Sequence, residues 1–248
     1  MSNTASAPSF RRPSLTLLGT EPWRAVFELA KHTVSGVRSA QRGDGHPVIL
    51  FPGLGSDGLA LVPLRNYCNS LGYHAFDWGR GRNTGPNGDV DAWLDDLAEH
   101  TLEQLAPFDQ KATLIGWSLG GLYARELAKK IRPRVRQVIT LGTPINWNSD
   151  ATHVGWIMRL MKGESAAIDA KRRERLRKPP SVPITSLYSR HDGIVSWQAC
   201  RHARARRTLE DVEVEGSHLG MGWNPSVMRI VADRLAQPAG QWRPLRAA

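Results

Sequence analysis

The chain contains the pentapeptide Gly-Trp-Ser-Leu-Gly, with Ser118 at its centre. An apolar run over 112–117 precedes the serine, and a helical pattern over 119–131 follows it. A glycine two residues away on each side removes Cβ atoms that would clash in a sharp strand-to-helix turn. Such a turn presents the serine hydroxyl for attack on an acyl carbonyl. Because the pattern also fits an ordinary packing turn, its meaning depends on whether the chain supplies the other catalytic groups.

Two further residues supply the groups that a serine nucleophile needs. Asp192 lies just past the apolar run 183–189, where a carboxylate can hold the Nδ1–H of an imidazole. His218 follows the run 212–216 in a glycine-rich loop, from which its Nε2 could reach the serine. Each has an ordinary alternative, as a turn-forming Asp-Gly pair or a loop histidine. The order serine, aspartate, histidine, each after a strand, predicts a catalytic triad.

Two other histidines compete with His218 for the role of base. His191 is the strongest rival because it neighbours Asp192, and His153 is the next. The remaining histidines lie before a strand or within strand-like and helical segments, where a reactive imidazole is less expected.

A glycine-rich loop over 51–58 (FPGLGSDG) would complete the site. Its glycines let a ligand approach the backbone closely. The backbone N–H groups of Leu54 and Leu119 would then bind the oxyanion that forms during acyl transfer. We also expect substrate contacts from five residues: Gly53, Trp117, Thr143, Met158 and Met161.

Strand-like and helical segments alternate from residue 46 onward, which predicts an α/β fold with a mostly parallel sheet and helices on both faces. Strands are expected at 47–51, 73–78, 112–117, 135–143, 183–189 and 212–216. Helices are expected at 59–72, 89–108, 119–131, 196–206 and 225–236. Because ligands bind at the carboxyl ends of parallel strands, the loops that carry the candidate residues should converge there.

Residues 1–45 form the first predicted unit, before a main domain over 46–248. It consists of a poorly ordered tail over 1–19 and a helix over 20–38, with Thr20 as its N-cap. The apolar stripe of this helix is expected to pack on the main domain, because a free stripe would be a liability. The stripe contains Trp23, Val26, Phe27, Ala30 and Val34.

An insertion at about 146–180 interrupts the alternation and is expected to form a small cap. Val154, Ile157, Met158 and Met161 share one helical face within it. That face would be either a flexible wall for an acyl chain or a surface that packs on the domain. Two arginines elsewhere, Arg80 and Arg82, could bind an anionic substrate or brace loops.

These features resemble the α/β-hydrolase family, and within it the bacterial esterases and lipases, over about residues 46–237. The resemblance is carried by LFPGLGSD, DWGRGRNTGP, GWSLGG, LGTP, YSRHDGIVSW and GSHLGMGWNP. One departure is Phe-Pro-Gly at 51–53, where many lipases have His-Gly.

The resemblance implies Ser118 as nucleophile, Asp192 as acid and His218 as base, with Leu54 and Leu119 as oxyanion donors. It also implies hydrolysis of carboxylic or lipid esters, a reaction that needs no metal or organic cofactor. Two alternatives remain open: acyl transfer or cleavage of another acyl bond on the same fold, and a non-catalytic binding protein that uses the basic surface. The natural substrate, the acyl chain length and the oligomeric state stay open.

Composition and charge limit the expected binding partners and cellular location of the protein. The net charge is +10, from 33 Lys and Arg against 23 Asp and Glu, but the arginines are scattered. We therefore expect weak attraction to anionic surfaces and no specific nucleic-acid binding. No run approaches the roughly 18 apolar residues of a membrane span, and the first residues lack a signal-peptide core. We expect a cytoplasmic protein, with two cysteines that form no disulfide framework.

Overall fold

A computed structural model describes residues 12–35, 42–146, 170–203 and 206–245 of the chain. Most of the predicted cap lies outside these described residues. The structure therefore does not address two predictions: His153 as a rival base, and the acyl-chain wall of Val154, Ile157, Met158 and Met161. Within the described part of the chain, no helix is both long and apolar enough to cross a membrane.

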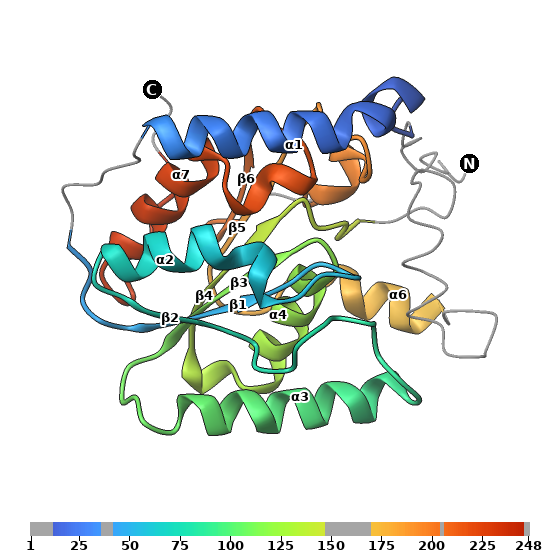
Figure 1. Ribbon diagram of the computed structural model, residues 1–248. Helices are drawn as coiled ribbons and strands as arrows, with labels where there is room; N and C mark the ends of the chain where they lie inside the picture. The colour runs from blue at the N-terminus through green and yellow to red at the C-terminus, as the bar shows by residue number, and fades with distance from the viewer. Residues whose placement is uncertain (1–11, 36–41, 147–169, 204–205, 246–248) are drawn as a thin grey trace.

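The centre of the fold is a six-stranded parallel sheet (Figure 1). Its strands, in spatial order, are β2 (His74–Asp77), β1 (Pro47–Phe51), β3 (Ala112–Trp117), β4 (Val135–Leu141), β5 (Ile184–Tyr188) and β6 (Leu209–Glu213). Every neighbouring pair runs parallel, so the carboxyl ends of all six strands lie along one edge. This arrangement confirms the predicted α/β fold.

Helices cover both faces of the sheet (Figure 1). One face carries α2 (Val62–Ser70) and α7 (Pro225–Ala236), and the other carries α3 (Val90–Leu105) and α4 (Leu119–Lys130). Side chains of β1 alternate between the two cores: Val48 and Leu50 face one, and Ile49 and Phe51 face the other. Burial on both faces explains why this strand is apolar throughout rather than alternating.

Three predicted elements of the main domain differ clearly from the structure. The expected helix over 59–72 is split into a 3₁₀ turn, η1 (Gly58–Leu61), and α2, where Pro63 lies in the first turn. The helix expected over 196–206 is only a 3₁₀ turn, η3 (Trp197–Cys200). After it, the backbone N–H and Nδ1 of His202 both bond Asp211, which binds the chain to β6 instead of continuing the helix. Strand β6 begins three residues earlier than predicted. Its start was missed because this half-exposed edge strand lacks the apolar run on which the prediction relied.

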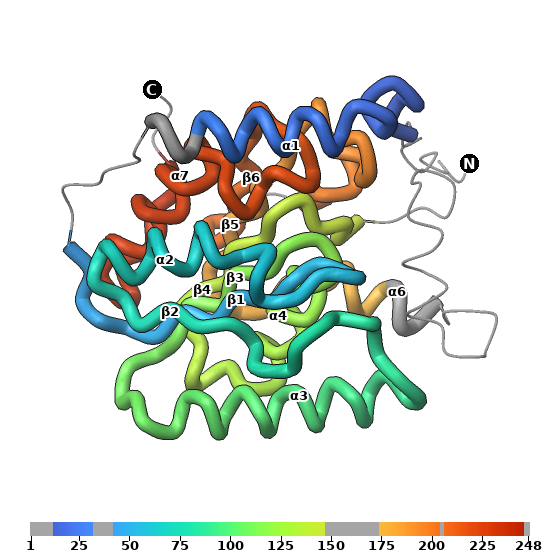
Figure 2. The backbone as a smooth tube through the Cα atoms, viewed as in Figure 1, coloured from blue at the N-terminus to red at the C-terminus, as the bar shows by residue number. Residues whose placement is uncertain are grey.

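The N-terminal helix α1 (Leu15–Ser35) differs most from expectation. It begins within the predicted tail, and Thr20 is not its N-cap, since its Oγ1 donates to the carbonyl of Thr16 inside the helix. The helix does pack on the domain, against α7 and the 3₁₀ turn η4 (Leu219–Gly222), as Figure 2 shows.

The packed face of α1 is not the apolar stripe. Trp23, Val26 and Phe27 are 77%, 62% and 61% exposed. The opposite face is buried instead and contains Glu21, Ala25 and Glu28. The prediction for the stripe was wrong because the two glutamates bind backbone N–H groups of the domain, and those polar contacts set the rotation of the helix.

Candidate active site

Ser118 lies at the turn between β3 and α4, at the carboxyl edge of the sheet. Its backbone has φ 54° and ψ −120°, and it is the only non-glycine residue with positive φ in the described part of the chain. Such a conformation costs about 1–3 kcal/mol and persists only where the surroundings enforce it. Here the N–H of Ser118 donates to the carbonyl of Leu141 at the end of β4, at 2.8 Å.

Glycines make this strained turn possible. A Cβ on Gly120 would collide with the backbone of Phe51 and Pro52, and a Cβ on Gly116 would collide with Gly121. The first turn of α4 therefore packs directly on the loop that follows β1. Both glycines were predicted to remove clashing Cβ atoms, and the structure identifies the backbone that each one accommodates.

The structure brings Asp192 and His218 together from the loops after β5 and β6. Oδ2 of Asp192 lies 2.6 Å from Nδ1 of His218. The other carboxylate oxygen, Oδ1, accepts the N–H groups of Ile194 and Val195 at 2.8 and 2.7 Å. Both side chains are almost fully buried. The carboxylate is thus held by its own loop and presents one oxygen to the imidazole, which places the histidine proton on Nδ1.

His218 lies beside the serine turn and is hydrogen-bonded to Trp117, the residue before Ser118. The indole Nε1–H of Trp117 donates to the carbonyl of His218 at 3.0 Å, and the two rings lie 5.9 Å apart. No described residue bonds Nε2 of His218, and Ser118 Oγ forms no direct hydrogen bond with it. Catalytic hydrogen bonds are commonly long in ligand-free sites and tighten when substrate binds.

The surroundings of His218 raise its pKa above the ordinary value. Burial opposes the charged imidazole and is the largest single influence, but the negative charges of Asp192 and Glu21 outweigh it. Glu21 belongs to α1, a helix that the sequence placed outside the catalytic domain. An imidazole with a raised pKa is a stronger base, as long as the pH keeps it neutral.

The loop after β1 brings Gly53, the neighbour of Leu54, close to the serine. A Cβ on Gly53 would lie only 3.3 Å from the Cβ of Ser118, so the two backbones are adjacent. Leu54 is half-buried, and its N–H has no acceptor among the described residues. Leu119 is the first residue of α4, where an N–H has no partner within the helix. The geometry leaves both donors available near Ser118.

Asn83 holds the same loop, and the sequence analysis missed it. Its Nδ2 donates to the carbonyl of Pro52 at 2.8 Å, and its backbone exchanges hydrogen bonds with Ser56 and Gly55, both at 2.7 Å. Asn83 is fully buried. Asn83 lies in the segment GRGRNTGP, whose glycines and proline indicate a loop but not what the amide binds.

The two arginines of that segment bind protein groups. Arg80 forms an ion pair with Asp96 on α3 at 2.5 Å. Arg82 donates to the carbonyl of Gly55 at 3.0 Å. These contacts match the bracing role that the sequence left open beside substrate binding.

Two further residues singled out in the sequence are Thr143, a predicted substrate contact, and His191, a rival base. Thr143 is buried after β4, and its side chain fills the space beside Gly121 in α4. His191, the main rival for the base, is exposed, and its carbonyl accepts a hydrogen bond from Arg24 of α1. The structure therefore pairs Asp192 with His218 and not with its neighbour.

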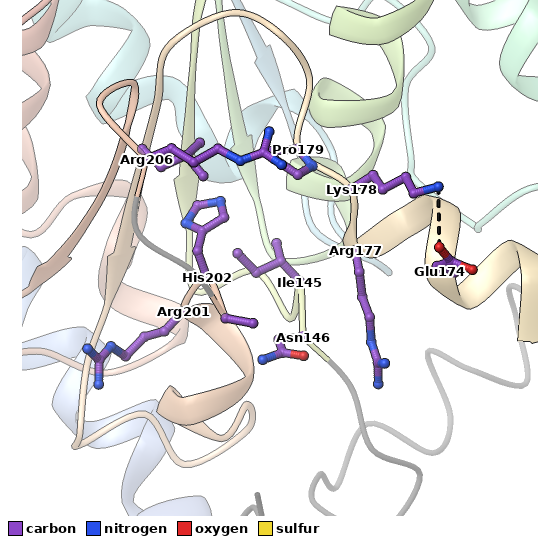
Figure 3. Close-up of a pocket in the computed structure, with 11 residues that line it drawn as sticks. Ile145, Asn146, Glu174, Arg177, Lys178, Pro179, Arg201, His202 and Arg206 are labelled. Carbon is purple, nitrogen blue, oxygen red and sulfur yellow. Dashed lines mark ion pairs between the residues drawn. The ribbon is translucent and has the colours of Figure 1, made fainter. Parts of the chain in front are cut away.

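A separate basic hollow of about 360 Å³ lies beyond the ends of β4 and η3 (Figure 3). It gathers two basic segments that are far apart in the sequence, one from the end of α6 (Ala170–Arg177) and one from the chain after η3. Its charged lining residues are Glu174, Arg177, Lys178, Arg201 and Arg206, with Lys178 paired to Glu174. None of the three candidate catalytic residues lines it.

Comparison with known proteins identifies the family of the chain. Residues 48–247 match the family model described as the alpha/beta hydrolase family. The chain belongs to the α/β-hydrolase family. Among solved structures, Aspergillus fumigatus lipase B is similar over 83% of this chain and 57% of its own, with 16% identity and a TM-score of 0.59. A monoacylglycerol lipase from Paleococcus ferrophilus covers 79% of this chain and 95% of its own, with 16% identity and a TM-score of 0.58.

Two curated relatives of this α/β hydrolase are named pimeloyl-[acyl-carrier protein] methyl ester esterase. The protein from Aliivibrio salmonicida is 28% identical over 172 residues, which is 69% of this chain and 58% of the relative. The protein from Shewanella woodyi is 30% identical over 102 residues, or 41% of this chain and 37% of the relative. The matches thus span between about a third and three fifths of the length of these relatives.

Proposed function

We propose that this α/β hydrolase is a serine hydrolase that cleaves carboxylic esters, with Ser118 as nucleophile, His218 as base and Asp192 as the acid that orients it. The observation that carries the proposal is a buried Asp192–His218 pair whose Nε2 has no partner among the described residues, beside a serine in a strained turn. Relatives and structural neighbours named as esterases and lipases support the ester as the bond attacked.

In the first half of the reaction, the hydroxyl proton of Ser118 moves to His218 and negative charge develops on the ester carbonyl oxygen. Nε2 of His218 takes the hydroxyl proton as Ser118 Oγ bonds to the ester carbonyl carbon. Asp192 stabilises the resulting imidazolium through the Nδ1–H bond. The N–H groups of Leu54 and Leu119 bind the negative oxygen of the tetrahedral intermediate.

Collapse of that intermediate breaks the bond to the alcohol, which receives the proton from His218 as it leaves. Water then attacks the acyl-enzyme, His218 takes a proton from the water, and a second collapse releases the carboxylic acid and restores Ser118. Protons and electrons balance over the two halves, with one ester and one water consumed.

Ester turnover by the purified protein tests the proposal. We expect hydrolysis of short- and medium-chain p-nitrophenyl esters, and a fall in kcat of roughly 10⁴- to 10⁶-fold in Ser118→Ala, because the nucleophile is removed. Ser196→Ala is the matched control, since Ser196 is a buried serine of the loop after β5. Absence of turnover by wild type, or full activity in Ser118→Ala, would contradict the proposal.

A further inference from the structure

The carboxylate of Glu21 on α1 joins the two loops that carry the acid and the base. Its Oε1 accepts the N–H of Gly193, which follows Asp192, at 2.7 Å, and the N–H of His218 itself at 3.1 Å. Its Oε2 accepts the N–H of Leu219 at 3.1 Å. One side chain therefore contacts the backbone beside the acid and the backbone of the base, across 172 and 197 residues of sequence.

This carboxylate is buried and well supplied with donors. Glu21 is 1% exposed, and Arg24, one turn later in α1, donates to its Oε1 at 2.9 Å. Three backbone N–H groups and one guanidinium point at it, so every contact suits an anion. Burying a carboxylate costs free energy unless such donors are present. The four donors therefore compensate for the burial of Glu21.

The helix backbone also contacts the acid loop directly. A Cβ on Gly193 would collide with the carbonyl of Leu17 in the first turn of α1, so no side chain fits between them. Arg24 donates from Nη1 to the carbonyl of His191 at 2.6 Å, on the other side of Asp192. The acid is therefore flanked on both sides by contacts with α1.

Glu28, two turns after Glu21 on the same face, provides an internal comparison. Its Oε1 accepts the N–H of Ser217 at 2.6 Å, and its Oε2 lies 3.2 Å from Nδ2 of Asn224. These contacts fasten α1 to the base loop, but they reach neither the acid loop nor the backbone of His218.

We propose that Glu21 is a positioning residue of the active site, which holds the acid and base loops at one separation and places a negative charge beside the base. The inference rests on the proposed function, because it assigns a role toward Asp192 and His218. It extends that function to α1, which precedes residues 48–247 that match the family. The helix is then part of the catalytic unit rather than an appendage.

Glu21 acts through two properties, the reach of its side chain and its charge. The reach of the side chain sets the geometry of the acid–base pair and hence kcat. Its charge acts on His218 together with the charge of Asp192, while Arg24 partly offsets it. Removal of the Glu21 charge lowers the pKa of His218, so the acidic limb of the kcat/KM profile moves to lower pH.

Substitutions at position 21 test both effects in the full-length protein. Glu21→Gln keeps one acceptor oxygen but sets an NH₂ group against the N–H of Leu219 and removes the charge. We expect kcat to fall by about 10- to 100-fold with KM nearly unchanged, and the acidic limb to move to lower pH. Glu21→Asp keeps the charge but is one methylene too short to join both loops. We expect a similar fall in kcat with the acidic limb unmoved.

Glu28→Gln is the matched control, because it alters a buried carboxylate on the same helix face. It should reduce thermal stability as Glu21→Gln does, yet leave the acidic limb in place and reduce kcat less. Equal effects of Glu21→Gln and Glu28→Gln on kcat and pH profile would make both residues merely structural and overturn the proposal. The proposal is also overturned if neither position-21 variant folds, as judged by thermal melts, because the role of Glu21 would then be structural.

The wild-type protein separates failure of this inference from failure of the proposed function. A wild type that neither turns over esters nor reacts with a fluorophosphonate at Ser118 removes the proposed function, and the role of Glu21 with it. An active wild type with a folded Glu21→Gln variant of unchanged kcat and pH profile removes the role of Glu21 alone.

Discussion

Two histidine–aspartate pairs lie at opposite ends of the sheet, each with a buried imidazole, and they differ in what bonds the second ring nitrogen. His46, just before β1, has Nδ1 2.5 Å from Asp44, and its Nε2 bonds Oγ1 of Thr113 at 2.9 Å. His218, at the carboxyl end, has the same Nδ1–carboxylate contact, but its Nε2 has no partner among the described residues. An Asp–His contact alone therefore does not identify a base, whereas an available Nε2 beside a nucleophile does.

A third pair supports the distinction. Nδ1 of His202 lies 2.7 Å from Asp211, and its Nε2 accepts from the buried Arg125 at 3.0 Å. Both nitrogens are again used by protein groups. His46 and His202 therefore act as parts of the scaffold, and their variants provide controls for His218.

The largest expected contrast is between His218→Gln and His46→Gln. We expect His218→Gln to lower kcat by roughly 10⁴- to 10⁶-fold, because no base remains for Ser118. His46→Gln should keep kcat and instead lose about 1–3 kcal/mol of stability, because a buried hydrogen-bond network is broken. Steady-state kinetics and urea unfolding measure the two. The comparison breaks if both variants lose activity equally.

The aspartates should differ in the same sense. We expect Asp192→Asn to lower kcat by about 10⁴-fold, because an amide cannot fix the tautomer of His218 or stabilise its charge. Asp44→Asn leaves a half-exposed group near Arg136 and should keep kcat close to wild type. An Asp192→Asn variant with activity like that of Asp44→Asn would show that the Asp192–His218 pair is structural, as the Asp44–His46 pair is.

A smaller effect is expected from the indole that links the serine turn to the base. Trp117→Phe keeps the ring but removes the Nε1–H that donates to the carbonyl of His218. We expect kcat to fall by about 10-fold, since a buried carbonyl loses its partner at a cost of 1–3 kcal/mol, roughly. Trp78→Phe removes a part-buried indole N–H bond of similar length, to the carbonyl of Gly81, and is expected to affect kcat less. Equal losses of kcat in Trp117→Phe and Trp78→Phe would show that the indole bond of Trp117 contributes only to the stability of the fold.

The smallest expected difference is in the titration of the two histidines. Burial is the main cause that lowers the pKa of His46, and Arg136 adds to it, whereas the carboxylates of Asp192 and Glu21 raise the pKa of His218. As pH falls, His218 should therefore take up its proton first, and kcat/KM should fall with it. NMR titration of the imidazoles, beside the pH–rate profile, would contradict the account if His46 titrated at the higher pH.

The sequence predicted best those elements whose pattern is governed by their own residues. Strands β1 and β3 and helix α7 have the predicted bounds, because strands buried on both faces and an amphipathic helix leave clear local patterns. The loops with Ser118, Asp192 and His218 were predicted from their glycines, which are local signals, and from their order along the chain.

The sequence predicted poorly those features that depend on distant backbone groups. The rotation of α1 is set by glutamates that bind N–H groups 172 to 198 residues away, and no apolar periodicity records such contacts. Asn83 was missed for the same reason, because its carbonyl partner follows a different strand. The polar edge strand β6 and the short turn η3 lack the apolar pattern on which the prediction relied.

The most direct test of the central claim is the rate at which a fluorophosphonate modifies Ser118 in wild type, His46→Gln and His218→Gln. Peptide mapping by mass spectrometry identifies the labelled residue. The account predicts stoichiometric labelling of Ser118 in wild type and His46→Gln at similar rates, and labelling at least about 10³-fold slower in His218→Gln, because the hydroxyl then lacks its base. Labelling of another residue, or equal rates in all three proteins, would contradict it.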